Sequence, residues 1–376
     1  MFIGELFARN NKNMLTKITH PLVIIMGAGA TRGGLEKQTK SLPPPIDLDF
    51  FDIAAQLEGH GTKQIASKIL KSLWELYGTT SNISLEKYYR DIETRAKIGE
   101  FAKTGNQPKD WKKRQRELEE LVRRVYIHTT CDMSKSPIAP LESPEHVKIF
   151  QNLKASDTIV TFNYDLLIEE SLKTLKTWRP IDGFGNVRVH GRRSNWYKHW
   201  LEENKKIKAK SSKNKSKSIS LLKLHGSLGW TTYNGEIRLK PHPYYVGTRN
   251  KQPRSEEISI LPPGWNKQID INPYKKFWHE TRLKMEKCKS LMIVGYSLPE
   301  TDLLAQALFS EIVRMRSVRK QYLKQLHLAD PNDAIKQKFA NLFAPALGPK
   351  GIVFRYSNIQ KIAESCSDAA PCSDPA

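Results

Sequence analysis

The stretch LVIIM-GAGAT at residues 22–31 decides the fold. Residues 22–26 form a short aliphatic run that ends at glycine, which is typical of a strand buried on both faces of a parallel sheet. Residues 27–31 let the backbone approach a ligand and point N–H groups at an anion such as pyrophosphate. The GxGxxG fingerprint is imperfect, because Arg32 stands at the third glycine position and Gly33 comes one residue late. We therefore predict a strand followed by a turn over residues 27–34. For residues 27–31, phosphate binding and an ordinary strand-to-helix turn are equal alternatives.

Further apolar runs have the same character as residues 22–26 and predict strands of the same kind. Helical patterns separate several of these runs, for example over residues 302–316. Strands that alternate with helices predict an α/β fold with a mostly parallel, Rossmann-like sheet. The additional predicted strands are residues 158–162, 221–224, 291–294, 325–329 and 352–354.

The chain of 376 residues is long enough for two domains, or for one large domain with insertions. We expect an N-terminal segment over residues 1–20, one α/β domain over residues 21–364 and a frayed tail over residues 365–376. Helical patterning over about residues 50–150 predicts a helical insertion subdomain. The sequence KKIKAKSSKNKSK has no apolar face and predicts a flexible basic loop over residues 203–218.

The composition excludes several classes of protein. Hydrophobic residues make up 39% of the chain, and no apolar run approaches the roughly 20 residues that span a bilayer. The first residues contain no long apolar segment, so we expect neither a membrane protein nor a signal peptide. The net charge is +22, from 61 Lys+Arg against 39 Asp+Glu. A charge of this size attracts nucleic acid, another polyanion or an acidic partner protein.

The cysteines and histidines do not have the spacing of metal ligands. The 4 cysteines contain no CxxC pair, and the 10 histidines contain no HxH or HxxxH pair. We therefore expect no metal and no zinc ribbon. Cysteines used in this way favour free thiols in a reducing cytosol, and hence a cytoplasmic protein. The GxSxG elbow of hydrolases is also missing from the sequence.

Polar or glycine-rich residues follow most of the predicted strands, as GAGAT, NYD, HGS, GYS and ADP. In an open parallel sheet, ligands bind beyond the carboxyl ends of the strands. The carboxamide of Asn163 suits a ribose hydroxyl and a water, and its alternative role is a local Asx turn. The imidazole of His225 titrates near neutrality and suits a general base or proton relay, and its alternative role is a structural hydrogen bond.

The other strand-end residues have an equally good structural explanation. Asp165 suits the N-cap of the helix that follows it. Gly295 and Ser297 suit a plain turn into the next helix, which Thr301 or Asp302 would cap. Asp330 can accept from the two hydroxyls of a ribose, or it can serve as a turn residue before Pro331.

Taken in order, these segments resemble the sirtuin fold, and more closely the sirtuin-like (SIR2-like) domains of bacterial anti-phage defence proteins. FNYD at residues 162–165 resembles the sirtuin TQN-[IV]-D segment, and LHGS at residues 224–227 resembles the catalytic HG segment. GYSL at residues 295–298 resembles the GTSL segment that packs on the cofactor, and residues 260–267 look like a segment of the defence branch. Two features differ: the zinc ribbon of deacylating sirtuins is missing, and GAGATRGGLEK replaces their GAGISxxSGIPDFR loop.

The resemblance implies an NAD+ hydrolase (NADase) that cleaves the nicotinamide–ribose bond, with NAD+ as substrate and no metal. The products would be nicotinamide and ADP-ribose, or a cyclised form of it, and the role would be antiviral defence by NAD+ depletion. Asn163 would orient the ribose and the water, and His225 would take a proton. The expected cofactor-binding residues are Gly27, Ala28, Gly29, Thr31, Asp165, Gly295, Ser297 and Asp330.

Two other functions stay open. A protein deacylase would use the same cofactor and the same histidine. A nucleic-acid-binding or nuclease subunit of a defence complex would use the basic helix at residues 112–124 and the basic loop. The resemblance also implies a homo-oligomer, with a HerA-type ATPase or a short Argonaute as a possible partner. The helical region at residues 50–150 would then cover the cofactor and gate the site upon assembly.

Overall fold

The computed structural model describes residues 18–38, 42–101, 108–134, 138–178, 184–185, 187, 189–190, 219–233, 236–239, 258–260 and 272–367. Four predicted features lie wholly or partly outside the described residues. They are the basic loop at residues 203–218, the segment after residue 260 that resembles the defence branch, residues 1–17 of the N-terminal segment and residues 368–376 of the tail.

The centre of the fold is a six-stranded sheet in the order β12-β11-β10-β1-β4-β6, and every pair of neighbours is parallel. All residues of β1 and β10 are buried, as expected for aliphatic strands covered on both faces. The predicted α/β fold with a mostly parallel sheet is confirmed. The strands are β1 (Leu22–Met26), β4 (Thr158–Thr161), β6 (Ser220–Lys223), β10 (Ser290–Val294), β11 (Leu323–Ala329) and β12 (Leu347–Tyr356).

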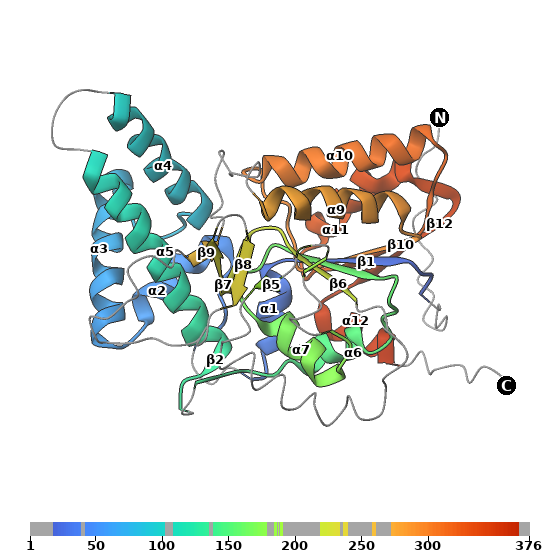
Figure 1. Ribbon diagram of the computed structural model, residues 1–376, viewed down its shortest axis with the longest axis horizontal. Helices are drawn as coiled ribbons and strands as arrows, with labels where there is room; N and C mark the ends of the chain where they lie inside the picture. The colour runs from blue at the N-terminus through green and yellow to red at the C-terminus, as the bar shows by residue number, and fades with distance from the viewer. Residues whose placement is uncertain are drawn as a thin grey trace.

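Helices cover both faces of this sheet (Figure 1). On one face lie α1 (Ala28–Leu35), α6 (Pro144–Phe150), α7 (Leu167–Leu175) and α12 (Ile359–Ser367). On the other face lie α9 (Tyr274–Lys287), α10 (Leu303–Val318) and α11 (Asp333–Phe343). Apolar side chains from both layers and from the sheet form one continuous core. This doubly wound arrangement leaves the carboxyl ends of the strands as the natural place for a ligand.

The predicted turn at residues 27–34 is wrong, because helix α1 begins at Ala28, directly after β1. Its glycines have low helix propensity, but tertiary packing requires them. A Cβ on Gly33 would lie 2.7 Å from Ile359, and a Cβ on Gly34 would lie 2.6 Å from the Ser143 hydroxyl. Larger residues would push α1 away from α12 and α6.

A separate group of helices stands beyond one end of the sheet (Figure 1). This helical insertion consists of α2 (Phe50–Gln56), α3 (His60–Tyr77), α4 (Leu85–Phe101) and α5 (Pro108–Thr130). Its own apolar core also includes Tyr164, from the loop after β4, and Leu228, from the segment that follows β6. The insertion therefore packs directly on the edge that carries the candidate site. It ends earlier than the predicted residue 150, because α6 packs on α7 and α12.

A second, small sheet, which was not predicted, contains β5 from before β6 in the chain and three strands from after it. Its strand order is β5-β8-β7-β9, with β5 (Val189–His190), β7 (Gly226–Tyr233), β8 (Glu236–Leu239) and β9 (Ile258–Ile260). Most of its strands are too short to show a clear period of two in the sequence. The sheet is held by tertiary packing that the sequence pattern does not show. The ring centroid of Trp230 on β7 lies 4.5 Å from that of Phe184 and 5.7 Å from that of Phe277.

Both ends of the α/β domain extend further than predicted. Thr19 donates its backbone N–H to Gln325, and His20 Nδ1 lies 2.7 Å from the buried carboxylate of Asp157. Helix α12 runs to Ser367 and buries Cys366, so the tail does not begin at residue 365. None of the helices in the described part of the chain combines the length and apolarity that a bilayer-spanning segment requires.

Two buried histidines predict a loss of stability in acid. Burial lowers the pKa of His146 and of His327 to about 4. Because the folded-state pKa lies below the unfolded value near 6.5, the fold needs both rings neutral. Their contribution is complete above about pH 6.5 and is lost as the pH falls from there towards 4, by about 1.4 kcal/mol per pH unit for each ring.

Urea unfolding at pH 7.5 and pH 5.0 measures this effect. In His327→Phe, one titration is removed, while the stacking on Phe354, 4.7 Å away between centroids, is kept. We expect the stability of this variant to fall less than that of the wild type between the two pH values, by about 2 kcal/mol. Equal losses in the two proteins would contradict the prediction.

Candidate active site at the carboxyl edge of the sheet

Register places the predicted site residues along one edge of the sheet. In the parallel pairs Met26 lies opposite Thr161 and Val294, and Thr161 lies opposite Lys223. Gly27, Asn163, His225 and Gly295 follow these paired positions within one or two residues, so they leave the sheet at the same level. Asp330 follows β11, next to β10. The edge expected from the sequence therefore exists, with Asn163 and His225 on the neighbouring strands β4 and β6.

The glycines of this edge allow the backbone after β1 to pass close to the backbone after β10. Gly27 N–H donates to the Val294 carbonyl at 3.1 Å, Gly29 N–H to the Gly295 carbonyl at 2.9 Å, and Ala30 N–H to the Gly27 carbonyl at 2.9 Å. Gly295 has a φ of +57°, and a Cβ there would lie 2.1 Å from the Ala30 nitrogen. Only glycine allows this crossing. These N–H groups are already bonded within the protein, so the expected run of free backbone donors over residues 27–31 does not hold for them.

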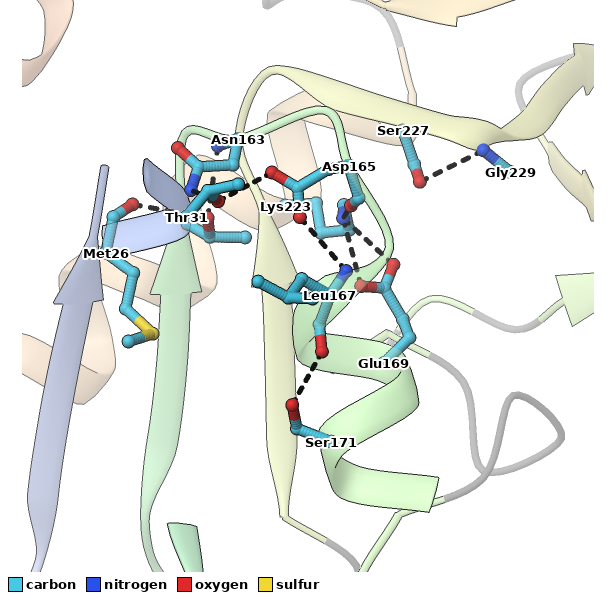
Figure 2. Close-up of polar contacts among 11 residues, drawn as sticks. Met26, Thr31, Asn163, Asp165, Leu167, Glu169, Ser171, Lys223, Ser227 and Gly229 are labelled. Atoms are coloured by element: carbon cyan, nitrogen blue, oxygen red, sulfur yellow. Dashed lines mark hydrogen bonds and ion pairs between the residues drawn. The ribbon is translucent and has the colours of Figure 1, made fainter. Parts of the chain in front are cut away.

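The carboxamide of Asn163 joins the ends of β1 and β4. Its Nδ2 donates to the Gly27 carbonyl and to Thr31 Oγ1, each at 2.9 Å, and its side chain is buried (Figure 2). Thr31 Oγ1 in turn donates to Asp165 Oδ2 at 2.8 Å, and Asp165 Oδ1 accepts from the Leu167 N–H. No hydrogen bond to Asn163 Oδ1 occurs in the described ranges. The amide is thus held by its nitrogen and presents its oxygen, an acceptor for a hydroxyl or a water.

A fully buried ion pair between Lys223 and Glu169 contacts the hydrogen-bond network of Asn163, Thr31 and Asp165. Lys223 Nζ donates to the Asp165 carbonyl at 2.5 Å and lies 2.9 Å from Glu169 Oε1 and 3.2 Å from Oε2 (Figure 2). Both side chains are 0% exposed. Burial raises the pKa of the Glu169 carboxyl, and the charge of Lys223 opposes that rise. The pair fixes the turn between β4 and α7, and therefore the backbone on either side of Asn163.

The imidazole of His225 lies among aromatic rings. Its centroid is 5.0 Å from that of Phe162, edge to face, and 6.3 Å from that of Tyr164. These two residues flank Asn163 in the chain. Phe162 also stacks on Tyr296 with centroids 4.1 Å apart and planes 2° apart. His225 is only 5% exposed, so its ring is held in a water-poor environment.

Asp302 belongs to the site and was not predicted as a site residue. Its Oδ2 lies 3.6 Å from His225 Nε2 and accepts a hydrogen bond of 2.8 Å from the Tyr296 hydroxyl. Its Oδ1 caps α10 by accepting from the Ala305 N–H. The sequence suggested the capping role alone, because no local pattern connects Asp302 with a histidine 77 positions earlier.

Ser297 and Asp330, two of the expected cofactor-binding residues, lie further along the edge. Ser297 is exposed at the end of β10, and its carbonyl and that of Leu298 accept from Lys338 Nζ. Asp330 forms an Asx turn by accepting from the Asn332 N–H at 2.8 Å. Burial raises the pKa of the Asp330 carboxyl. Asp330 has the turn role weighed from the sequence. The N-cap of α7 is Leu166 and not Asp165, whose Oδ1 accepts from the Leu167 N–H two residues on.

The described residues contain no cluster of His, Cys, Asp and Glu that could hold a metal ion. Cys131, Cys288 and Cys366 are free and buried, and Cys372 lies outside the described residues. Burial raises the pKa of the Cys288 thiol to about 11, which leaves it protonated and unreactive near neutral pH.

The fold is an open, doubly wound α/β sheet with polar side chains at its carboxyl edge. Proteins with this fold bind their ligands, often nucleotides, at that edge. The family model of the SIR2-like domain matches residues 157–343, a span that includes Asn163, His225 and Asp302. The chain therefore contains a SIR2-like domain, and SIR2-like domains form a family of NAD-using enzymes.

No curated protein matches the sequence. Among solved structures, a mutant Sir2 homologue in complex with ADP-ribose is 13% identical, with 94% of each chain covered and a TM-score of 0.41. A Sir2 homologue in complex with NAD is also 13% identical, with 92% of this chain and 88% of that chain covered and a TM-score of 0.35. Likenesses this distant add no weight to the family match.

Proposed function

We propose that this protein is an NAD+ glycohydrolase that cleaves the bond between nicotinamide and ribose. The observation that carries the proposal is the placement of Asn163 and His225 at the ends of the neighbouring parallel strands β4 and β6. Both follow a strand end within the SIR2-like span, at the edge where α/β sheets bind nucleotides.

The reaction balances with water as the second substrate. The glycosidic C–N bond breaks and its electron pair goes to the pyridine nitrogen, so nicotinamide leaves as a neutral molecule. Water forms the new C–O bond on the ribose, and its proton passes to His225 and then to solvent. The barrier is the positive charge that develops on the ribose. The Oδ1 of Asn163, whose Nδ2 is fixed by Gly27 and Thr31, is suited to hold the ribose hydroxyl or the water.

The proposal predicts that the purified protein releases nicotinamide from NAD+ in stoichiometric amounts with ADP-ribose, or with a cyclised form of it. Chromatography of NAD+ reactions measures all three species. A parallel reaction with an acyl-lysine peptide tests the deacylase alternative. The deacylase would be favoured if the peptide is deacylated and samples without peptide release no nicotinamide. Intact NAD+ in every reaction, with and without added DNA or RNA, would contradict the proposal.

The basic helix α5 offers less free charge for nucleic acid than its sequence suggests. Arg123 and Arg124 both pair with Glu120, at 2.6 and 2.7 Å. Arg114 donates to the Lys68 carbonyl and lies 3.8 Å from Glu117. These three cations are therefore engaged within the helical insertion. A contact with nucleic acid stays a prediction for residues outside the described ranges.

The proposed biological role is antiviral defence by NAD+ depletion in the cytoplasm. An enzyme that destroys an essential dinucleotide must be restrained until it is needed. The buried His225 and the insertion core that reaches Tyr164 and Leu228 are consistent with such restraint. We propose that the active form is a homo-oligomer, alone or with a HerA-type ATPase or a short Argonaute.

A further inference from the structure

A carboxylate is placed next to the proposed base by an element far away in the sequence. Asp302, the residue that caps α10, is 1% exposed and lies with Oδ2 3.6 Å from His225 Nε2. This separation is within ion-pair range but too long for a hydrogen bond. Catalytic hydrogen bonds are often long before substrate binds and shorten in the complex.

The surroundings of Asp302 favour its ionised form. The Tyr296 hydroxyl donates to Oδ2 at 2.8 Å, and the Ala305 N–H at the start of α10 donates to Oδ1. The positive end of the 16-residue helix α10 adds a favourable field for an anion at this position. A burial as deep as this is tolerated for a carboxylate only when it is hydrogen-bonded or paired.

Two titratable groups that the described contacts place next to this pair are tyrosines that stay neutral near pH 7. Tyr164 faces the ring from the end of β4, and Tyr296 lies behind the carboxylate at the end of β10. Burial raises the pKa of both tyrosines well above the usual value, and the charges of Asp302 and of Glu86 on α4 raise both further. The charge that the described contacts place against His225 is that of Asp302, at 3.6 Å.

We propose that Asp302 is a positioning residue for His225. The inference rests on the proposed function, because it assigns a partner to the base of that reaction. The carboxylate holds the ring with Nε2 towards itself and stabilises the imidazolium that forms when Nδ1 takes the proton of water. This is the logic of a base oriented by a third group. Tyr296 and the start of α10 hold the carboxylate in place.

NMR of the imidazole nitrogens tests the pair without any need for enzyme activity. The variant Asp302→Asn keeps the shape and the capping oxygen but removes the charge. We expect His225, assigned by comparison with His225→Phe, to titrate about one pH unit lower in Asp302→Asn than in the wild type. In Tyr296→Phe, the carboxylate keeps its charge and loses a competing donor, so the titration should move in the opposite direction or stay unchanged. An unchanged His225 titration in Asp302→Asn overturns the inference.

Kinetics supply the second measurement. In Asp302→Asn we expect kcat for nicotinamide release to fall at least about tenfold, with KM for NAD+ nearly unchanged. The acid limb of the pH–rate profile should move to lower pH, as the titration does. Wild-type rates and profile in Asp302→Asn overturn the positioning role. If the wild-type protein releases no nicotinamide, the proposed function fails, while the NMR titration still decides whether the pair exists.

Discussion

Replacement of His225 by phenylalanine is expected to lower the rate of nicotinamide release by at least about 100-fold, because a positioned general base contributes roughly 10²–10⁴. Phenylalanine keeps an aromatic ring against Phe162 and Tyr164, so the packing of the strand-end loops is preserved. Alanine at this position should be equally inactive but less stable. Initial rates at saturating NAD+, with melting temperatures of the same samples, separate the two effects.

Asn163→Ala should cause a loss of the same order, since the amide oxygen that would hold the ribose or the water disappears. It also removes two donors from the Gly27 carbonyl and Thr31, so its melting temperature should fall more than that of His225→Phe. His279→Ala is the matched control, because the side chain of His279 on α9 is exposed. Full turnover by both His225→Phe and Asn163→Ala would remove the mechanism.

Replacement of Lys223 by methionine is expected to destabilise the fold by about 3–5 kcal/mol at pH 8, the usual cost when one partner of a buried ion pair is removed. The change leaves Glu169 at 0% exposure without its cation and also removes the donor to the Asp165 carbonyl. Glu169 can avoid the cost of a buried charge by binding a proton. Its folded-state pKa, already raised by burial, then rises further above the unfolded value.

The sign of the pH dependence follows from that rise. A carboxyl whose pKa is higher in the fold contributes stability at low pH and loses it as the pH increases. Lys223→Met should therefore be less destabilised at pH 5 than at pH 8, as measured by urea unfolding against wild-type protein at each pH. The double variant Lys223→Met/Glu169→Leu should recover most of the loss, because both charges are gone. A pH-independent loss would show that Glu169 does not take up the proton.

The position of Lys223 also links stability to the site. It lies two residues before His225, and its Nζ holds the carbonyl of Asp165, two residues after Asn163. One buried ammonium thus ties together the loops that carry both proposed catalytic residues. Variants at Lys223 should lose activity together with stability, whereas His225→Phe should lose activity alone.

The sequence by itself determined the parallel α/β sheet and the edge at which its polar residues gather. Continuous aliphatic runs such as residues 22–26 can only be buried on both faces, and alternation with helices makes the strands parallel. Parallel strands expose their carboxyl ends on one side, so Asn163 and His225 had to share an edge once both were placed after strands. The cap of α10 at Asp302 was also within reach, because capping is local.

Tertiary structure alone decided what surrounds those residues. Lys223 is a charged residue inside an apolar run, and only the approach of Glu169 from α7 explains it. The glycines of residues 27–34 suggested a turn, but the close approach of Gly295 and Ile359 makes them part of a packed helix. The contact between Asp302 and His225 joins elements 77 positions apart. Such contacts depend on how the helices pack on the sheet, and no local pattern of residue types contains that information.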